Sequence, residues 1–182
     1  MCQHVKWSLP TRAGAKLIII RAYRESDAES VGRIIANTYG EFNLGFASPE
    51  EKQKLLGPFQ FARSTDEAHR AAIAQAIRAA MVFVAEDDRE IVGVLRGRTE
   101  RIQSLFVRGD YQRRGISRLL VERCEQECIR QGARTIKVAS TLLAIPFYLS
   151  LGYKRTTGIR NGWSFGGAGL RYHPMKKRVA GR

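Results

Sequence analysis

The chain of 182 residues carries 31 lysine and arginine residues against 17 acidic residues, so its formal net charge is +14. This length fits one domain that buries about 70 % of the surface exposed in the unfolded chain, which argues against a second folded domain. No stretch reaches the ~20 apolar residues of a membrane span, and the N-terminus lacks the continuous apolar core of a signal peptide. We therefore expect a cytoplasmic protein without a membrane segment, whose charge favours anionic ligands, nucleic acid or acidic protein surfaces.

The first part of the chain reads as a strand followed by a helix. We expect residues 1–16 to be irregular, residues 17–177 to form one domain, and residues 178–182 to be a basic tail. The apolar run over 17–23, with three consecutive isoleucines, predicts a strand. A helix with one apolar face then begins at Ser26.

The next region, residues 40–80, is less regular and contains two helical pieces, over 49–56 and 66–80. Its four phenylalanines are Phe42, Phe46, Phe59 and Phe61. They indicate packing beneath a long connection, which is also where binding specificity often lies. Three helix starts have the Ser-x-x-Glu form of a capping box, with the serine at Ser26, Ser48 and Ser64.

Two apolar runs, 81–86 and 90–98, flank Asp87-Asp88-Arg89 and predict a hairpin. A strand over 101–107 extends this antiparallel meander. After the central helix described below, residues 135–139 predict a fifth strand, and Tyr148 lies in a short helix that Gly152 ends. The rest of the chain predicts a strand over 153–160, a turn region at Asn161-Gly162, and a last strand over 170–176.

The turn between Val107 and the central helix carries the strongest chemical signal. Its glycine, Gly115, allows a sharp turn or a close approach to a ligand, and the helix that follows has no capping side chain. Three cations surround this helix start: Arg113, Arg114 and Arg118. A cation is unfavourable there by ~0.3 to 1 kcal/mol because the helix dipole is positive at that end. A bound phosphate would satisfy both the free N–H groups and the guanidinium groups.

The three cysteines, Cys2, Cys124 and Cys128, do not have the spacing of a metal site. Cys124 and Cys128 lie one helical turn apart, in line with Ile116 and Leu120. We expect these two to be buried thiols rather than metal ligands or a redox pair.

The segment L-F-V-R-G-D-Y-Q-R-R-G-I-S resembles the acyl-coenzyme A motif of the GNAT superfamily of N-acetyltransferases, L-x-V-x-P-x-x-[Q/R]-x-x-G-[hydrophobic]-[G/A]. Gln112, Gly115 and Ile116 match it directly. Gly109 stands where the family often has proline, and Ser117 where it has glycine or alanine. Both residues are small, so backbone access to a ligand is kept.

A second segment, A-I-P-F-Y-L-S-L-G-Y over 144–153, resembles the family's A-x-x-F-Y-x-x-x-G-[F/Y]. Thr141 stands where the family often has asparagine. The order β-α-α-β-β-β-α-β-α-β-β, from about Leu17 to Lys177, is also similar to the GNAT fold. The resemblance implies an α/β fold with a mixed, mostly antiparallel sheet of about seven strands and flanking helices, splayed between the fourth and fifth strands.

By this resemblance, the chain transfers the acetyl group of acetyl-CoA directly to a primary amine, without a metal. The coenzyme pyrophosphate is expected on the N–H groups of the turn, and a backbone N–H of Phe106 or Val107 on the thioester oxygen. Tyr148 is expected to protonate the departing thiolate. The residues expected to bind the coenzyme are Leu105, Phe106, Val107, Gln112, Arg113, Arg114, Gly115, Ile116, Ser117 and Arg118.

The general base is open at this stage. The family commonly has a glutamate on or just before the strand that ends at Val107, which makes Glu100 the first choice and Glu41 the second. A chain of water molecules is a third route for the proton.

Two other functions remain open from the sequence: a basic nucleic-acid-binding module and a GNAT fold that binds coenzyme A without turnover. The acceptor amine is not identified, since the connection over 40–65 suits either a closed pocket for a small amine or a groove for a protein amine. A homodimer is also left open.

Overall fold

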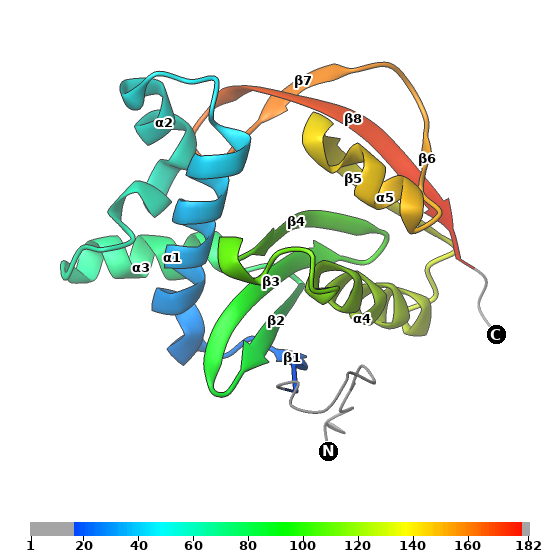
Figure 1. Cartoon of the computed structure of the whole chain (residues 1–182), viewed down its shortest axis with the longest axis horizontal. Helices are drawn as coiled ribbons and strands as arrows, with labels where there is room; N and C mark the ends of the chain where they lie inside the picture. The colour runs from blue at the N-terminus through cyan, green and yellow to red at the C-terminus, as the bar shows by residue number, and fades with distance from the viewer. Residues whose placement is uncertain (1–16, 180–182) are drawn as a thin grey trace.

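The computed structural model describes residues 17–179 of the chain. The segment expected to be irregular, 1–16, and residues 180–182 of the expected tail lie outside this range. In chain order, the strands and α-helices are β1 (Ile19–Ala22), α1 (Ala28–Thr38), α2 (Pro49–Leu56), α3 (Glu67–Ile77), β2 (Met81–Asp87), β3 (Glu90–Arg98), β4 (Arg101–Val107), α4 (Ile116–Arg130), β5 (Thr135–Thr141), α5 (Ile145–Ser150), β6 (Lys154–Arg155), β7 (Arg160–Trp163) and β8 (Ala168–Arg178) (Figure 1).

The strands form one sheet in the order β1-β2-β3-β4-β5-β8-β6, with β7 paired to β8. All neighbours are antiparallel except β4 and β5, which are parallel. The predicted mixed, mostly antiparallel sheet is therefore confirmed. It has eight strands in the described chain instead of about seven, because the single strand expected over 153–160 is replaced by β6 and β7, which pair with different parts of β8.

The splay expected between the fourth and fifth strands is confirmed. β4 and β5 are in register only at Arg101–Lys137 and Ile102–Val138, whereas β5 stays paired with β8 along its whole length. Figure 1 shows β5 and β8 diverging from β4 beyond this point. The facing edges of β4 and β5 therefore keep backbone groups that no neighbouring strand satisfies, which makes them available to a ligand.

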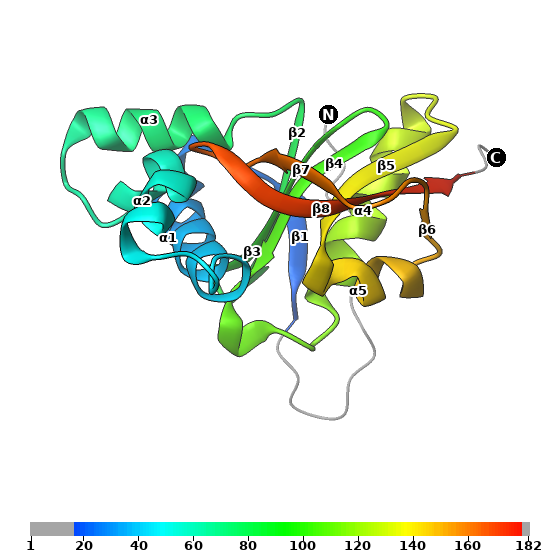
Figure 2. The same ribbon diagram turned by 90° about the horizontal axis from the view of Figure 1, so that it is seen from above.

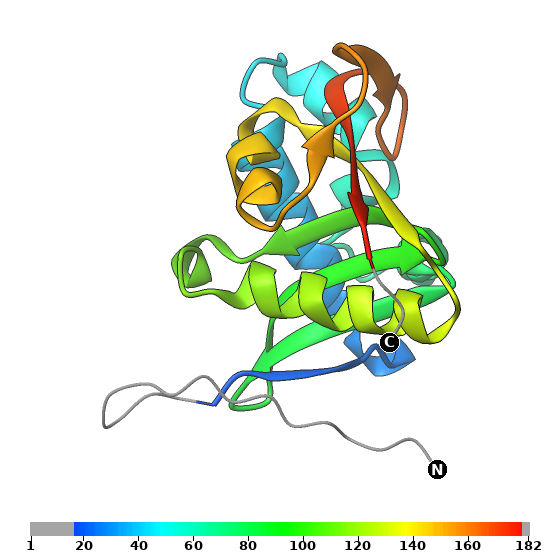
Figure 3. The same ribbon diagram turned by 90° about the vertical axis from the view of Figure 1, so that its right-hand side faces the viewer.

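Helices cover both faces of the sheet. α1, α2 and α3 lie on one side of β1–β4 and α4 lies on the other (Figures 2 and 3). Strand β3 contributes to two cores, since Val94 packs with the α1 side and Leu95 with the α4 side. On α4, Cys124 and Cys128 are fully buried free thiols, as the spacing predicted. Within residues 17–179, no helix is long and apolar enough to cross a bilayer.

The helix caps are partly as predicted. Ser48 caps α2, accepting a hydrogen bond from the Glu51 N–H at 3.2 Å. The other two serine caps are wrong. α1 follows a 3₁₀ turn in which the Asp27 carboxylate accepts from the Arg24 N–H at 2.7 Å, and α3 is capped by Asp66, which accepts from the His69 N–H at 3.1 Å. Aspartate caps as well as serine, so Asp66 replaces Ser64 at α3, whereas α1 has no side-chain cap of its own.

The turn expected at Asn161-Gly162 is also wrong. Both residues lie within β7, paired with Arg171 and Leu170 of β8. The hairpin turn comes later, where the Ser164 N–H donates to the Gly167 carbonyl at 2.7 Å. Pairing with the long strand β8 overrides the local turn preference of an Asn-Gly pair, and Arg178, expected in the tail, belongs to that same strand.

Candidate active site

A cavity of about 630 Å³ lies where β4 and β5 diverge. Its walls come from 103–107 of β4, 138–141 of β5, the helix α5, the end of α1, and the β7–β8 hairpin. Because the floor is a splayed strand pair, unpaired main-chain groups face the cavity.

The turn into α4 opens onto this cavity. Gly115 has φ 82° and Arg113 φ 61°, so the chain takes two left-handed residues before the helix begins. No side chain caps α4, as predicted. Among residues 17–179, none of the N–H groups from Arg113 to Arg118 has a hydrogen-bond acceptor; Leu119 is the first that does, donating to the Gly115 carbonyl at 3.2 Å. Consecutive free N–H groups at a helix N-terminus form an anion site.

Positive charge gathers at the same turn. Arg113, Arg114 and Arg118 are exposed and form no ion pair with any acidic residue of the described chain. The Arg114 guanidinium lies 4.7 Å from the centre of the Tyr111 ring. Unneutralised guanidinium groups beside free N–H groups indicate a ligand with negative charge.

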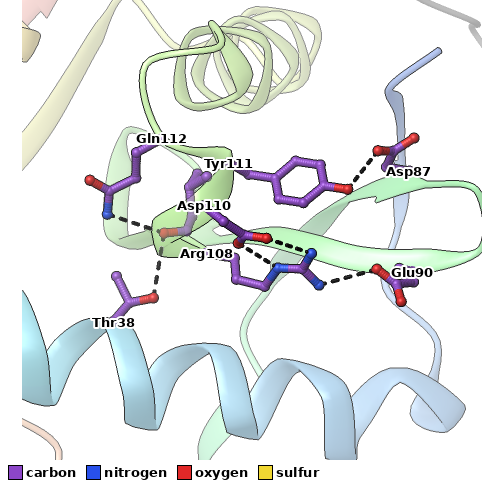
Figure 4. Close-up of polar contacts among 8 residues, drawn as sticks. Thr38, Asp87, Glu90, Arg108, Asp110, Tyr111 and Gln112 are labelled. Atoms are coloured by element: carbon purple, nitrogen blue, oxygen red, sulfur yellow. Dashed lines mark hydrogen bonds and ion pairs between the residues drawn. The ribbon is translucent and has the colours of Figure 1, made fainter. Parts of the chain in front are cut away.

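A polar network holds the start of the turn (Figure 4). The Tyr111 hydroxyl donates to the buried Asp87 carboxylate at 2.7 Å, and this hydrogen bond raises the pKa of Tyr111. Arg108 donates to Asp110 at 2.7 and 2.9 Å and to Glu90 at 3.2 Å. The turn is thereby tied to the β2–β3 hairpin.

Replacing Tyr111 by phenylalanine is expected to lower the free energy of unfolding by ~1–3 kcal/mol, since it leaves the buried Asp87 carboxylate without its donor. Denaturant unfolding measures the change. Tyr23→Phe is the control because the buried Tyr23 hydroxyl has no partner within the described chain. Equal losses of stability in the two variants would contradict the structural role of the Tyr111 hydroxyl.

The end of β4 is held by two side chains. The Val107 carbonyl accepts from the Thr38 hydroxyl and from the Gln112 amide, each at 3.4 Å (Figure 4). The Arg108 N–H donates to the Val92 carbonyl of β3 at 2.9 Å. Successive N–H groups of a strand point to opposite sides, so the Val107 N–H points away from β3, toward diverging β5, and that of Phe106 points to β3.

Tyr148 lines the cavity from α5. Its side chain is 4 % exposed and packs edge-on against Phe147 and Tyr153, with ring centres 5.1 and 5.4 Å away. Its hydroxyl forms no hydrogen bond to any residue within 17–179. Burial raises the pKa of Tyr148, so the phenol stays protonated at neutral pH.

The predicted coenzyme-binding residues are brought together only in part. Those that line the cavity are Leu105, Phe106, Val107, Gln112, Arg113 and Ser117. Arg114 and Gly115 belong to the turn and Arg118 to the first turn of α4, but all three lie outside the lining. Ile116 is a core residue at 1 % exposure.

Neither predicted base reaches the cavity. Glu100 lies in the β3–β4 turn with φ 66°, at the start of β4, whereas the cavity is lined by the other end of that strand. Glu41 is exposed and also lies outside the lining. Within the described chain, the lining contains no aspartate, glutamate or histidine. No group of such side chains that could hold a metal ion occurs within residues 17–179 either.

Sequence reasoning missed several residues of the cavity, above all Arg96 and Ser104. Arg96 interrupts an apolar strand, and Ser104 lies beside Gln103 in the middle of the next one. A polar residue inside an apolar run can indicate a binding site, but the strand register decides whether its side chain faces the cavity.

The β7–β8 hairpin closes the cavity on the α2 side. Its Ser164 hydroxyl donates to the Leu55 carbonyl at 2.8 Å. A Cβ added to Gly166 would lie 1.8 Å from the Lys54 carbonyl oxygen, so the hairpin turn lies directly against the α2 backbone. Phe165 packs edge-on against Phe59, with ring centres 4.7 Å apart. Of the four clustered phenylalanines, only Phe59 is fully buried, while Phe42 lines the cavity.

Solved structures with the same fold include several N-acetyltransferases. A GCN5-related N-acetyltransferase of Rhodopseudomonas palustris has a TM-score of 0.68 and 22% identity, covering 88% of this chain and 94% of that one. The PaiA N-acetyltransferase of Thermoplasma acidophilum, solved with coenzyme A, has a TM-score of 0.65 and 17% identity, with 89% and 99% coverage. YncA of Salmonella typhimurium, solved with acetyl-CoA, has a TM-score of 0.59 and 20% identity, with 90% and 94% coverage.

Comparison with proteins of curated function found no significant match. The family model described as "Acetyltransferase (GNAT) domain" matches residues 47–179, more than half of the chain. The match includes the splayed strand pair, the uncapped turn and α5. The chain therefore belongs to the GNAT acetyltransferase family.

Proposed function

We propose that the protein is an N-acetyltransferase that moves an acetyl group from acetyl-CoA to a primary amine by direct attack. The observation that carries this proposal is the run of free N–H groups from Arg113 to Arg118, set beside a cavity between splayed strands. Family membership and the coenzyme found in the PaiA and YncA structures support it.

The coenzyme pyrophosphate accepts hydrogen bonds from the N–H groups of the turn, with the helix dipole and the arginines adding attraction. The pantetheine arm runs between β4 and β5, and the thioester lies near the end of β4. The Val107 N–H, directed toward β5, donates to the thioester oxygen as negative charge develops on it. The Thr38 and Gln112 contacts to the Val107 carbonyl hold this peptide group in place.

In the reaction, the nitrogen lone pair of the amine attacks the carbonyl carbon and forms a C–N bond. The tetrahedral intermediate collapses, the C–S bond breaks, and the thiolate takes a proton from the Tyr148 hydroxyl. The attacking nitrogen loses one proton to water, and the tyrosine regains one from solvent. No group of the chain becomes acylated.

The described residues that line the cavity include no carboxylate that could take the proton of the amine. Glu100 and Glu41 lie outside the cavity lining, and no other carboxylate or imidazole of the described chain reaches it. We therefore assign proton removal to water, with the amine entering in its neutral form.

The proposal is tested by following thiol release from acetyl-CoA with a panel of primary amines. We expect thiol release that depends on the amine. The logarithm of kcat/KM should rise with pH with a slope of one and level off only at the pKa of each amine tested. A fixed pKa shared by all amines, in the range of a carboxylate or imidazole, would instead reveal a protein base.

Binding measurements beside the thiol-release assay distinguish the other candidate functions. Coenzyme A binding by calorimetry without thiol release would indicate a non-catalytic coenzyme-binding fold. No coenzyme binding, together with strongly salt-dependent binding to nucleic acid, would indicate a nucleic-acid-binding module.

A further inference from the structure

A half-buried arginine that forms no ion pair within the described chain lies in the cavity. Arg96 of β3 is half-buried and lines the cavity beneath the hairpin turn, 5.4 Å from the centre of the Phe165 ring. Its Nε donates to the Ile77 carbonyl at 2.9 Å, and its Nη2 lies 3.4 Å from the Arg78 carbonyl. These contacts leave several of its five N–H groups free, including both on Nη1.

Arg21, another partly buried arginine of the sheet, has the acidic partners that Arg96 lacks among the described residues. Arg21 of β1 pairs with both Asp27 and Glu86, each at 2.7 Å. Arg96 forms no ion pair within residues 17–179, and desolvation lowers its pKa. A guanidinium group stays protonated even so, which means that the cavity holds an uncompensated positive charge. Burying such a charge is unfavourable unless a counter-charge joins it.

Two further hydroxyl groups lie in the same wall. Ser104 pairs directly with Arg96 across β3 and β4, so their side chains are on the same face of the sheet. The buried Ser104 hydroxyl has no hydrogen-bond partner among the described residues. The buried Tyr39 hydroxyl lies beside Ser164 but forms no hydrogen bond of normal geometry with any described residue. Both residues line the cavity.

Resting on the proposed acetyl transfer, we propose that the acceptor is a small amine that also carries an anionic group, a carboxylate or a phosphate, which binds Arg96 and Ser104. Among the described residues that line the cavity, Arg96 is the one cationic side chain on the sheet face toward α1, and none is acidic. The hairpin closes the cavity on this side, so the anionic group lies at the closed end and the amine nitrogen faces the thioester.

This assignment separates the two ends of the cavity by charge. The turn at Gly115 binds the phosphates of the coenzyme, and Arg96, on a different strand and on the opposite face of the sheet from α4, binds the acceptor. A cationic polyamine has no counter-charge at this end and is expected to be a poor acceptor.

The test uses primary amines matched in size and differing only in the far group: carboxylate, phosphonate or neutral carboxamide. Thiol release gives kcat/KM for each. We expect at least one anionic set to exceed its carboxamide counterpart by about tenfold or more, and the better of the two anionic sets identifies the acceptor chemistry. Arg96→Gln is expected to reduce this preference to within about threefold.

The control is Arg98→Gln, which removes the same charge from an exposed position of the same strand outside the cavity lining. Arg98→Gln is expected to keep the preference. All variants must retain the thermal shift caused by coenzyme A, which shows that they fold and bind the coenzyme. Should Arg96→Gln fail this criterion, Ser104→Ala takes its place, with an expected loss of preference of about threefold to tenfold.

Carboxamide amines that react as well as the anionic ones, or an anionic preference that survives Arg96→Gln, would overturn the inference while acetyl transfer itself stands. If no amine reacts, binding of the same carboxylates and phosphonates to the coenzyme-bound protein is measured by calorimetry. Binding that Arg96→Gln abolishes supports the anion site although acetyl transfer fails, and absence of binding overturns the site.

Discussion

Replacing Tyr148 by phenylalanine is expected to lower turnover by about 10²-fold or more, with coenzyme affinity nearly unchanged. The change removes one oxygen from a side chain that is 4 % exposed and packed edge-on against two aromatic rings, so packing is conserved. Because burial raises the pKa of Tyr148, the phenol remains a proton donor throughout a usual assay range. The wild-type rate should therefore show no loss from tyrosine ionisation up to about pH 10.

Tyr153→Phe is the matched control for this prediction. Tyr153 is also buried, its ring contacts Tyr148, and its hydroxyl faces Glu125 without completing a hydrogen bond in the described chain, but it does not line the cavity. We expect turnover close to wild type in that variant. If Tyr148→Phe also stays within about threefold over a range of pH, with chemistry shown to limit the rate, Tyr148 only packs and water protonates the thiolate.

Gly115→Asp is expected to abolish coenzyme binding. The carboxylate would lie at the N-cap of α4, where it would accept from the N–H groups that the pyrophosphate requires and would repel the phosphate charge. Gly115 has φ 82°, so any side chain there is strained, but aspartate tolerates this region better than most residues and its charge is favourable at the positive end of the helix dipole. Calorimetry with coenzyme A measures the loss, and thermal unfolding measures the stability.

The same substitution at the other end of α4 separates strain from function. Gly132 has φ 86° and open space around its Cβ position, so Gly132→Asp imposes a similar left-handed strain, on an end of the helix where a negative charge is unfavourable. We expect Gly132→Asp to lose more stability than Gly115→Asp and still bind the coenzyme. Wild-type affinity in Gly115→Asp would show that the anion binds elsewhere.

Local signals were sufficient for most of the element order and for the turn. The apolar run of β3, the hairpin signature at Asp88-Arg89 and the missing cap of α4 depend on neighbouring residues alone, so they could be predicted from the sequence. The cap at Ser64 failed because Asp66 offers the same kind of hydrogen bond to a first-turn N–H of α3. The cap at Ser26 failed because α1 continues a 3₁₀ turn that the Asp27 carboxylate holds through the Arg24 N–H.

The sequence by itself therefore determined the family, the order of strands and helices from β2 through α5 and the position of the uncapped helix start, while the predicted order had two helices between β1 and β2 where the structure has three. Only the tertiary structure decided which side chains meet in the cavity. Glu100 and Val107 belong to one strand region, but the splay begins after Ile102, which leaves the glutamate at the wrong end. Arg96 and Ser104 meet through β3–β4 register, and a hairpin far along the chain covers them, because contacts between distant segments follow strand pairing and packing rather than local preference.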